Sequence, residues 1–84
     1  MPYTVEFAPS AARELQKLER RVQTRLATAI DALALNFRPQ GAAQLTGTEA
    51  WRIRVDDYRV LYEIKDRTLV VLILRIAHRR EVYR

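Results

Sequence analysis

The 84-residue sequence predicts an α+β fold in which helices cover one face of a mostly antiparallel sheet. Three observations support this prediction. Apolar residues alternate over residues 3–7, their spacing becomes helical from residue 11 to about 35, and alternation returns between residues 51 and 76. No repeat, low-complexity stretch or linker interrupts this order. We therefore expect one domain over residues 1–84, with an N-terminal strand, a helical region and a three-stranded antiparallel meander.

The first strand is expected where Tyr3, Val5 and Phe7 share one face. Pro9 ends it, and Ser10 is a suitable N-cap for the helix that follows. The helical region carries one apolar stripe, made of Leu15, Leu18, Val22, Leu26, Ala29, Ile30 and Leu33. No glycine or proline breaks the stripe, so the pattern alone permits a single helix from residue 11 to about residue 35, and periodicity does not show any turn near residues 18–21.

Pro39 and Gly41 close the helical region, and residues 42–49 are expected to form a connecting loop. Strands are then expected over residues 51–55, 58–64 and 68–76, with turns at Asp56-Asp57 and at residues 65–67. The last of these strands is apolar enough to be covered on both faces. Residues 78–84 form a short basic tail.

The composition argues against several chemistries. The chain has no cysteine, which removes disulfides, thiolate zinc sites and cysteine nucleophiles, and its single histidine leaves no convincing metal site. Gly41 and Gly47 do not make a phosphate-cradling loop. No segment has the pattern of a signal peptide or of a membrane span. We expect a cytoplasmic protein that needs no cofactor or metal and no membrane.

The net charge of +5 is concentrated in the second half of the chain. Residues 51–84 hold nine Lys and Arg against five Asp and Glu, and eight of the nine are arginine. An arginine-rich surface suits an anionic partner such as a nucleic acid or an acidic protein segment. Charge alone fits a solvated basic surface equally well.

Arginines alternate with apolar residues in Trp51–Val55, so Arg52 and Arg54 are expected on the face opposite the core. Arg59 has the opposite phase to the apolar residues of the next strand. It joins the same face if the two strands form a hairpin across Asp56-Asp57. Like charges on neighbouring strands repel each other. Because gathering three arginines costs stability, the pattern favours a polyanion site over a solvated face.

The tail adds His78, Arg79, Arg80 and Tyr83. Arginine suits phosphate because its planar fork donates two hydrogen bonds at once. A phenol can stack on a base or exchange a proton. Taken alone, Val82-Tyr83 is more typical of a pair that packs the C-terminus onto the sheet, and a lone histidine is more often a surface or turn residue than a catalyst.

An ordered set of motifs resembles the RelE branch of the RelE/ParE toxins over nearly the whole chain. The motifs are Pro2–Phe7, Leu45-Thr-Gly47, Trp51–Val55, Asp57-Tyr-Arg-Val-Leu-Tyr-Glu63 and Leu72-Ile-Leu-Arg-Ile-Ala-His-Arg-Arg-Glu-Val-Tyr83. The resemblance implies a helical hairpin on a small twisted sheet, with the helical region broken near residues 19–21. It also implies a cognate antitoxin, whose complex with the toxin is a possible binder of operator DNA.

The resemblance further implies endonucleolytic cleavage of mRNA in the ribosomal A site, and it assigns residues to this activity. Arg52 and Arg54 match two lysines of the best-known members, and Arg59 matches their strand arginine. Arg79 matches the arginine of the C-terminal basic loop, and Tyr83 matches the C-terminal tyrosine. That loop is shorter here, so Arg80 is an alternative to Arg79, and His78 stands at a basic position that is often lysine.

The mechanism that the resemblance implies uses no metal. A ribose 2′-hydroxyl attacks the adjacent phosphorus, with Tyr83 as the base. Arg52, Arg54 and Arg59 stabilise the charged phosphorane. Arg79 assists the leaving oxygen, although arginine is a reluctant acid. Replacing two lysines by arginine keeps the charge but removes any readily titrating amine.

Two other functions fit the same resemblance, because fold does not fix function. One is a ParE-like toxin that inhibits DNA gyrase without being an enzyme. The other is an inactive member kept as an antitoxin-binding and operator-binding module. In each case we expect an acidic or amphipathic antitoxin segment to cover the arginine face or to add a strand or helix beside the sheet.

Overall fold

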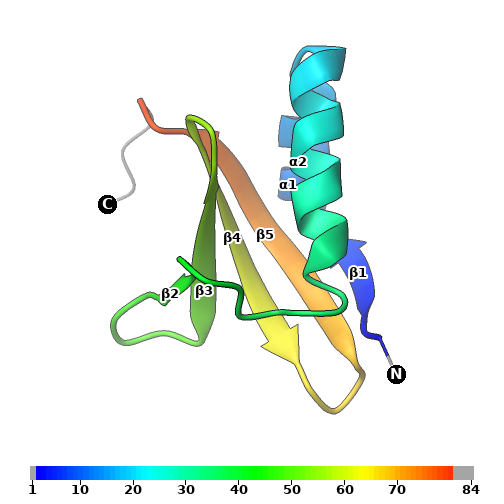
Figure 1. The fold of residues 1–84 in the computed structure, drawn as a ribbon, viewed down its shortest axis with the longest axis vertical. Helices are drawn as coiled ribbons and strands as arrows, with labels where there is room; N and C mark the ends of the chain where they lie inside the picture. The colour runs from blue at the N-terminus through cyan, green and yellow to red at the C-terminus, as the bar shows by residue number, and fades with distance from the viewer. Residues whose placement is uncertain (1, 81–84) are drawn as a thin grey trace.

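A computed structural model describes residues 2–80 of the chain. The elements follow in the order β1 (Thr4–Phe7), α1 (Pro9–Gln16), α2 (Arg20–Ala32), β2 (Ala43–Gln44), β3 (Ala50–Val55), β4 (Tyr58–Lys65) and β5 (Val70–His78). The strands form one sheet in the order β1-β5-β4-β3-β2. Both helices lie on the same side of this sheet (Figure 1). The α+β class and the antiparallel β3–β4–β5 meander are confirmed.

The sheet has one pairing that the sequence did not predict and one strand where a loop was expected. β1 pairs in parallel with β5, over Val70–Ile73, so the N-terminal strand joins the far side of the meander. The segment expected as a connecting loop contains the short strand β2, which pairs with Trp51 and Arg52. The pairing of β1 with β5 joins segments far apart in sequence and depends on how the helices return the chain, which local periodicity does not show.

The helical region is a hairpin, so the break implied by the family resemblance is confirmed, and the single long helix that periodicity alone permits does not form. α1 ends at Gln16 and α2 begins at Arg20. The side-chain amide of Gln23 donates to the carbonyl of Leu18 at 2.8 Å and to that of Gln16 at 3.3 Å. Because a side chain satisfies carbonyls that the break leaves without helical partners, the turn needs no glycine or proline.

The predicted N-cap is also corrected. The first helix begins at Pro9, its N-cap position is Ala8, and no side chain caps it. The Ser10 hydroxyl instead donates to the carbonyl of Leu74 on β5, at 3.0 Å. The second helix ends at Ala32, short of the predicted residue 35.

The core lies between the helices and the inward face of the sheet. Its largest fully buried side chains are Leu26, Ile30, Leu33, Val60, Tyr62, Val71 and Ile73. Tyr62 is completely buried, and its hydroxyl donates to the Phe37 carbonyl at 2.7 Å, which satisfies the one polar atom of this side chain. Within residues 2–80, neither helix is long and apolar enough to cross a membrane.

A β-bulge interrupts β5 at Leu74. Tyr62 is opposite Ile73, whereas the preceding residue, Leu61, is opposite Arg75. The extra residue changes which side chains face the core, because alternation restarts after a bulge. The prediction that this strand is covered on both faces is corrected. Before the bulge, the fully buried side chains of Val71 and Ile73 lie on the helix side, and the neighbouring residues are half-buried. β5 also extends to His78, which therefore belongs to the strand and not to the tail.

Candidate functional site

Arginines gather on the face of the sheet that the helices leave uncovered, called here the open face. Arg54 of β3 lies directly opposite Arg59 of β4, and directly opposite residues share a face. Arg52 lies two residues before Arg54, so it has the same orientation and stands opposite Leu61. The hairpin across residues 56 and 57 thus places the three arginines together, as the alternation predicts.

A fourth arginine joins this face. Arg75 of β5 is opposite Leu61, and Ala77 is opposite Arg59. The open face therefore carries two rows, Arg52-Leu61-Arg75 and Arg54-Arg59-Ala77. Sequence analysis did not single out Arg75. Arg75 is the single charged residue in the apolar strand, which could have marked it as a site residue. The face of the sheet on which it lies, however, depends on the bulge at Leu74.

A polar cavity of about 220 Å³ lies at the β3–β4 hairpin tip and is lined by Arg54, Asp56, Asp57, Tyr58, Arg59 and Arg79. Three predicted site residues, Arg54, Arg59 and Arg79, meet at this cavity. The Nε atom of Arg59 is buried and has no hydrogen-bond partner among the described residues. An unsatisfied buried donor costs free energy. An anion in the cavity would reduce the repulsion between the arginines.

The two turn aspartates hold arginines at the border of the cavity. Asp57 accepts the backbone N–H of Arg79 through its carbonyl at 2.6 Å, and its carboxylate lies 3.8 Å from the Arg79 Nε. Asp56 receives both Nε and Nη2 of Arg25, each at 2.9 Å. Asp56 also has a φ of 55°, a left-handed conformation that aspartate tolerates in turns. The two aspartates therefore form the predicted turn, and Asp57 also contacts Arg79.

The remaining predicted residues are placed differently. His78 is opposite Tyr58, in the row that faces the helices, and the two rings meet edge-on at 5.1 Å. The His78 Nδ1 accepts the backbone N–H of Arg80 at 3.1 Å. The structure thus separates His78 from Arg54 and Arg59 by the thickness of the sheet. Tyr83 lies outside the described residues.

Two tyrosines in the described region hold their protons more tightly than usual. The hydrogen bond that Tyr3 donates to Asp66, at 2.6 Å, raises the pKa of the Tyr3 phenol. Burial raises the pKa of Tyr62 to about 12. Both shifts oppose a role as a base near neutral pH. Among residues 2–80, no three His, Asp or Glu side chains come together as a metal site would require.

Residues 5–83 match the family described as ParE toxin of type II toxin-antitoxin system, parDE. The chain is also 37% identical, over 91 aligned residues, to Toxin RelG of Mycobacterium tuberculosis, with 100% of this chain and 99% of that toxin covered. The chain belongs to the RelE/ParE superfamily of toxins. The resemblance drawn from the sequence motifs is thereby confirmed.

Solved structures of RelE toxins share the fold of this RelE/ParE toxin. The RelBE2 toxin–antitoxin complex of Mycobacterium tuberculosis contains a chain with a TM-score of 0.83 and 31% identity, over 93% of this chain and 99% of that one. The archaeal RelE–RelB complex from Pyrococcus horikoshii gives a TM-score of 0.83 and 27% identity, over 98% and 100%. In this RelE/ParE toxin, the arginine-lined cavity is at the tip of the β3–β4 hairpin. The end of β5 lies beside this tip (Figure 1).

Proposed function

We propose that this toxin is a ribosome-dependent mRNA endonuclease that inhibits translation, with Arg52, Arg54, Arg59, Arg79 and Tyr83 as its catalytic residues. The observation that carries the proposal is the polar cavity lined by Arg54, Arg59 and Arg79. Guanidinium groups bind phosphate through paired hydrogen bonds and keep their charge at any physiological pH.

The proposed reaction is an internal transfer that uses no metal. The ribose 2′-oxygen forms a bond to the adjacent phosphorus while the bond to the 5′-oxygen breaks. The products are a 2′,3′-cyclic phosphate and a 5′-hydroxyl. Arg54 and Arg59 would stabilise the charge that develops on the phosphorane, and Arg52 would bind the neighbouring backbone.

The proton transfers are assigned to the C-terminal residues. Tyr83 is the proposed base, since cationic neighbours favour a phenolate and would lower its pKa. Tyr3 and Tyr62 are unsuited to this role because their pKa values are raised. Arg79 is the proposed partner of the leaving 5′-oxygen, with Arg80 or His78 as alternatives. His78 would have to act around the end of β5, because its ring lies in the helix-facing row.

We also propose that residues 1–84 form one toxin domain, which works in the cytoplasm and is held inactive by a cognate antitoxin. Two solved relatives of this fold, the RelBE2 complex and the archaeal RelE–RelB complex, contain the toxin together with its antitoxin. An acidic or amphipathic antitoxin segment would neutralise the arginine face and add buried surface that a chain of 84 residues lacks. Operator DNA is the proposed target of the toxin–antitoxin complex.

A second candidate function is inhibition of DNA gyrase without catalysis. The observation in its favour is that the matching family is described as ParE toxin. The same fold supports either activity. An inactive antitoxin-binding module is the third candidate, and it predicts tight antitoxin association without growth arrest.

The deciding experiment is induction of the toxin alone in bacteria, with transcript 5′ ends mapped during growth arrest. Arg54→Ala and Tyr83→Phe are compared with wild type, and Arg67→Ala is the matched control because this exposed arginine lies in the β4–β5 turn, at the opposite end of the sheet (Figure 1). The nuclease predicts new cuts inside translated codons that disappear in both site variants and persist in the control. Arrest with intact transcripts and a DNA-damage response would assign the protein to the gyrase-inhibiting branch.

A further inference from the structure

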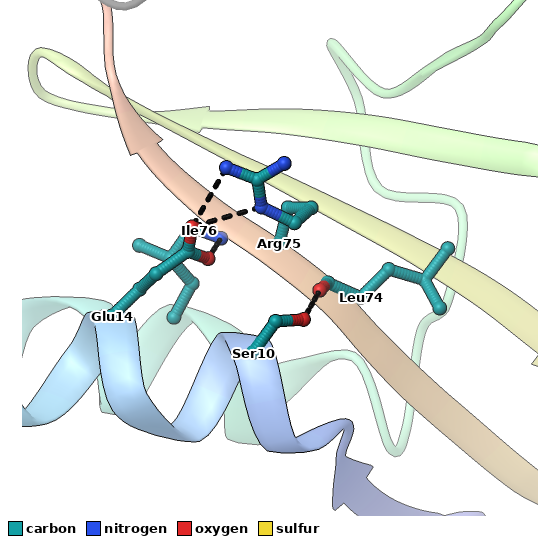
Figure 2. A network of polar contacts seen from close by, with 5 residues as sticks. All are labelled: Ser10, Glu14, Leu74, Arg75 and Ile76. Atoms are coloured by element: carbon teal, nitrogen blue, oxygen red, sulfur yellow. Dashed lines mark hydrogen bonds and ion pairs between the residues drawn. The ribbon is translucent and has the colours of Figure 1, made fainter.

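The edge of β5 changes its partner halfway along the strand. β1 pairs with β5 over Val70–Ile73, and directly after β1 the Ala8 N–H donates to the Ile73 carbonyl at 2.8 Å. From Leu74 onward, helix α1 covers the edge. Ser10 and Glu14 are four residues apart, so they lie on one face of α1, and both point at β5 (Figure 2).

These two side chains bond the backbone of β5 on either side of the bulge. The Ser10 hydroxyl donates to the Leu74 carbonyl at 3.0 Å, and Glu14 Oε1 accepts the Ile76 N–H at 2.8 Å. The carbonyls of Ile73 and Leu74 are therefore both directed toward the N-terminal segment. In a regular strand, successive carbonyls point to opposite edges. The Leu74 carbonyl departs from this rule because of the bulge, and Ser10 of α1 donates to it directly.

The other oxygen of Glu14 binds the neighbouring side chain. Glu14 Oε2 lies 2.8 Å from both Nε and Nη2 of Arg75 (Figure 2). The Glu14 carboxylate thus binds both the side chain of Arg75 and the backbone N–H of Ile76. The Arg75 and Glu14 side chains are 43% and 24% exposed, so the ion pair is only partly shielded from solvent.

The bulge decides what the end of β5 presents to the open face. Without the extra residue, the inward row of Val71 and Ile73 would continue with Arg75 and Ala77. With it, Ile76 is 3% exposed in the core, and Arg75 and Ala77 turn to the open face, opposite Leu61 and Arg59. Two residues further on, Arg79 reaches the polar cavity.

We propose that Glu14 is a positioning residue of the arginine site: it fixes the bulge of β5 and so holds Arg75 on the open face and Arg79 at the cavity. The part of this inference that concerns RNA cleavage rests on the proposed function. The part that concerns the end of β5 does not. Glu14 lies on the helix side of the edge and acts through β5, without contact to substrate.

The test compares Glu14→Ala, Glu14→Gln and wild type as purified full-length chains. Amide hydrogen exchange is measured residue by residue, and mRNA cleavage is measured on programmed ribosomes. Glu14→Gln keeps an oxygen for the Ile76 N–H but loses the charge that binds Arg75, whereas Glu14→Ala loses both contacts. Glu19→Ala is the charge-matched control, since Glu19 is exposed and makes no side-chain capping bond.

In Glu14→Ala, we expect exchange at Ile76–Arg79 to accelerate while α2 and β3 keep wild-type protection. The maximal cleavage rate should fall by about tenfold to 100-fold with little change in half-saturating ribosome concentration, the effect typical of misplaced catalytic groups. Glu14→Gln should restore most of the Ile76 protection and part of the rate. Glu19→Ala should match wild type in both measurements.

Wild-type exchange at Ile76–Arg79 in Glu14→Ala would overturn the inference, as would a cleavage loss that only follows the fraction of unfolded protein. If wild type itself does not cleave mRNA, the proposed function fails and amide exchange alone decides the role of Glu14. If wild type cleaves and Glu14→Ala cleaves equally well, the proposed function stands and the positioning role fails.

Discussion

Arg54 on β3 and Arg59 on β4 lie directly opposite each other on the open face of the sheet. Two guanidinium groups in this relationship repel each other, and the Nε of Arg59 is in addition buried without a hydrogen-bond partner in the described region. We therefore expect the pair to destabilise the free protein and to become favourable once a phosphate or carboxylate enters the cavity.

Arg59→Met should stabilise the free toxin and inactivate it. The substitution keeps an unbranched apolar stem but removes both the repulsion and the unsatisfied donor, so the free energy of unfolding should rise by about 0.5–1 kcal/mol. Cleavage should fall by about 100-fold or more because a phosphate-stabilising donor is lost. Urea denaturation and single-turnover cleavage measure the two effects, and Arg67→Met is the control. A less stable Arg59→Met variant would show that the arginine side chain is held by favourable contacts.

Arg54→Ala should lower the salt dependence of RNA binding. Each phosphate contact on a single strand contributes about 0.7 to the slope of log K against log salt, so losing one contact should reduce the slope by about that amount. A short RNA with a 2′-deoxy substitution at the cleavage position allows binding to be measured without turnover. An unchanged slope would place Arg54 outside the phosphate path.

Tyr62→Phe should destabilise the protein without affecting its activity. The substitution removes the hydrogen bond to the Phe37 carbonyl and leaves that acceptor in a part-buried position, which should cost about 1–2 kcal/mol. The ring itself stays in the core. Thermal denaturation and the cleavage assay at a temperature well below the midpoint separate the two effects. Tyr83→Phe is the opposite case, for which we expect lost cleavage at wild-type stability.

Stability should decline in alkaline solution because the native state holds the Tyr62 proton more tightly than the unfolded chain. The pKa is raised from 10.0 to about 12 by burial. The stabilisation is therefore complete below about pH 10 and is lost as the pH rises through 10 toward 12. Urea midpoints measured across this range should fall less steeply for Tyr62→Phe than for wild type. Tyr3→Phe is a useful comparison, since the Tyr3 pKa is raised mainly by the hydrogen bond to Asp66. Equal slopes for wild type and Tyr62→Phe would contradict the assignment.

The sequence by itself determined the features that depend on local geometry. The alternation of Trp51–Val55 placed Arg52 and Arg54 on one face, because successive side chains of a strand point to opposite sides. The short turn at Asp56-Asp57 then brought Arg59 opposite Arg54, because a tight hairpin fixes its own register. The motif order determined the superfamily, and with it the helix break that periodicity did not show.

Only the tertiary structure decided the features that depend on contacts between distant segments. The bulge at Leu74 reverses the phase of β5, and the groups that bond it, Ser10 and Glu14, are more than 60 residues away in sequence. The same rearrangement turns Arg75 to the open face and leaves His78 with Tyr58 on the other side. Local spacing specifies which residues alternate, whereas the point at which alternation restarts depends on α1 packing against the edge that β1 leaves uncovered.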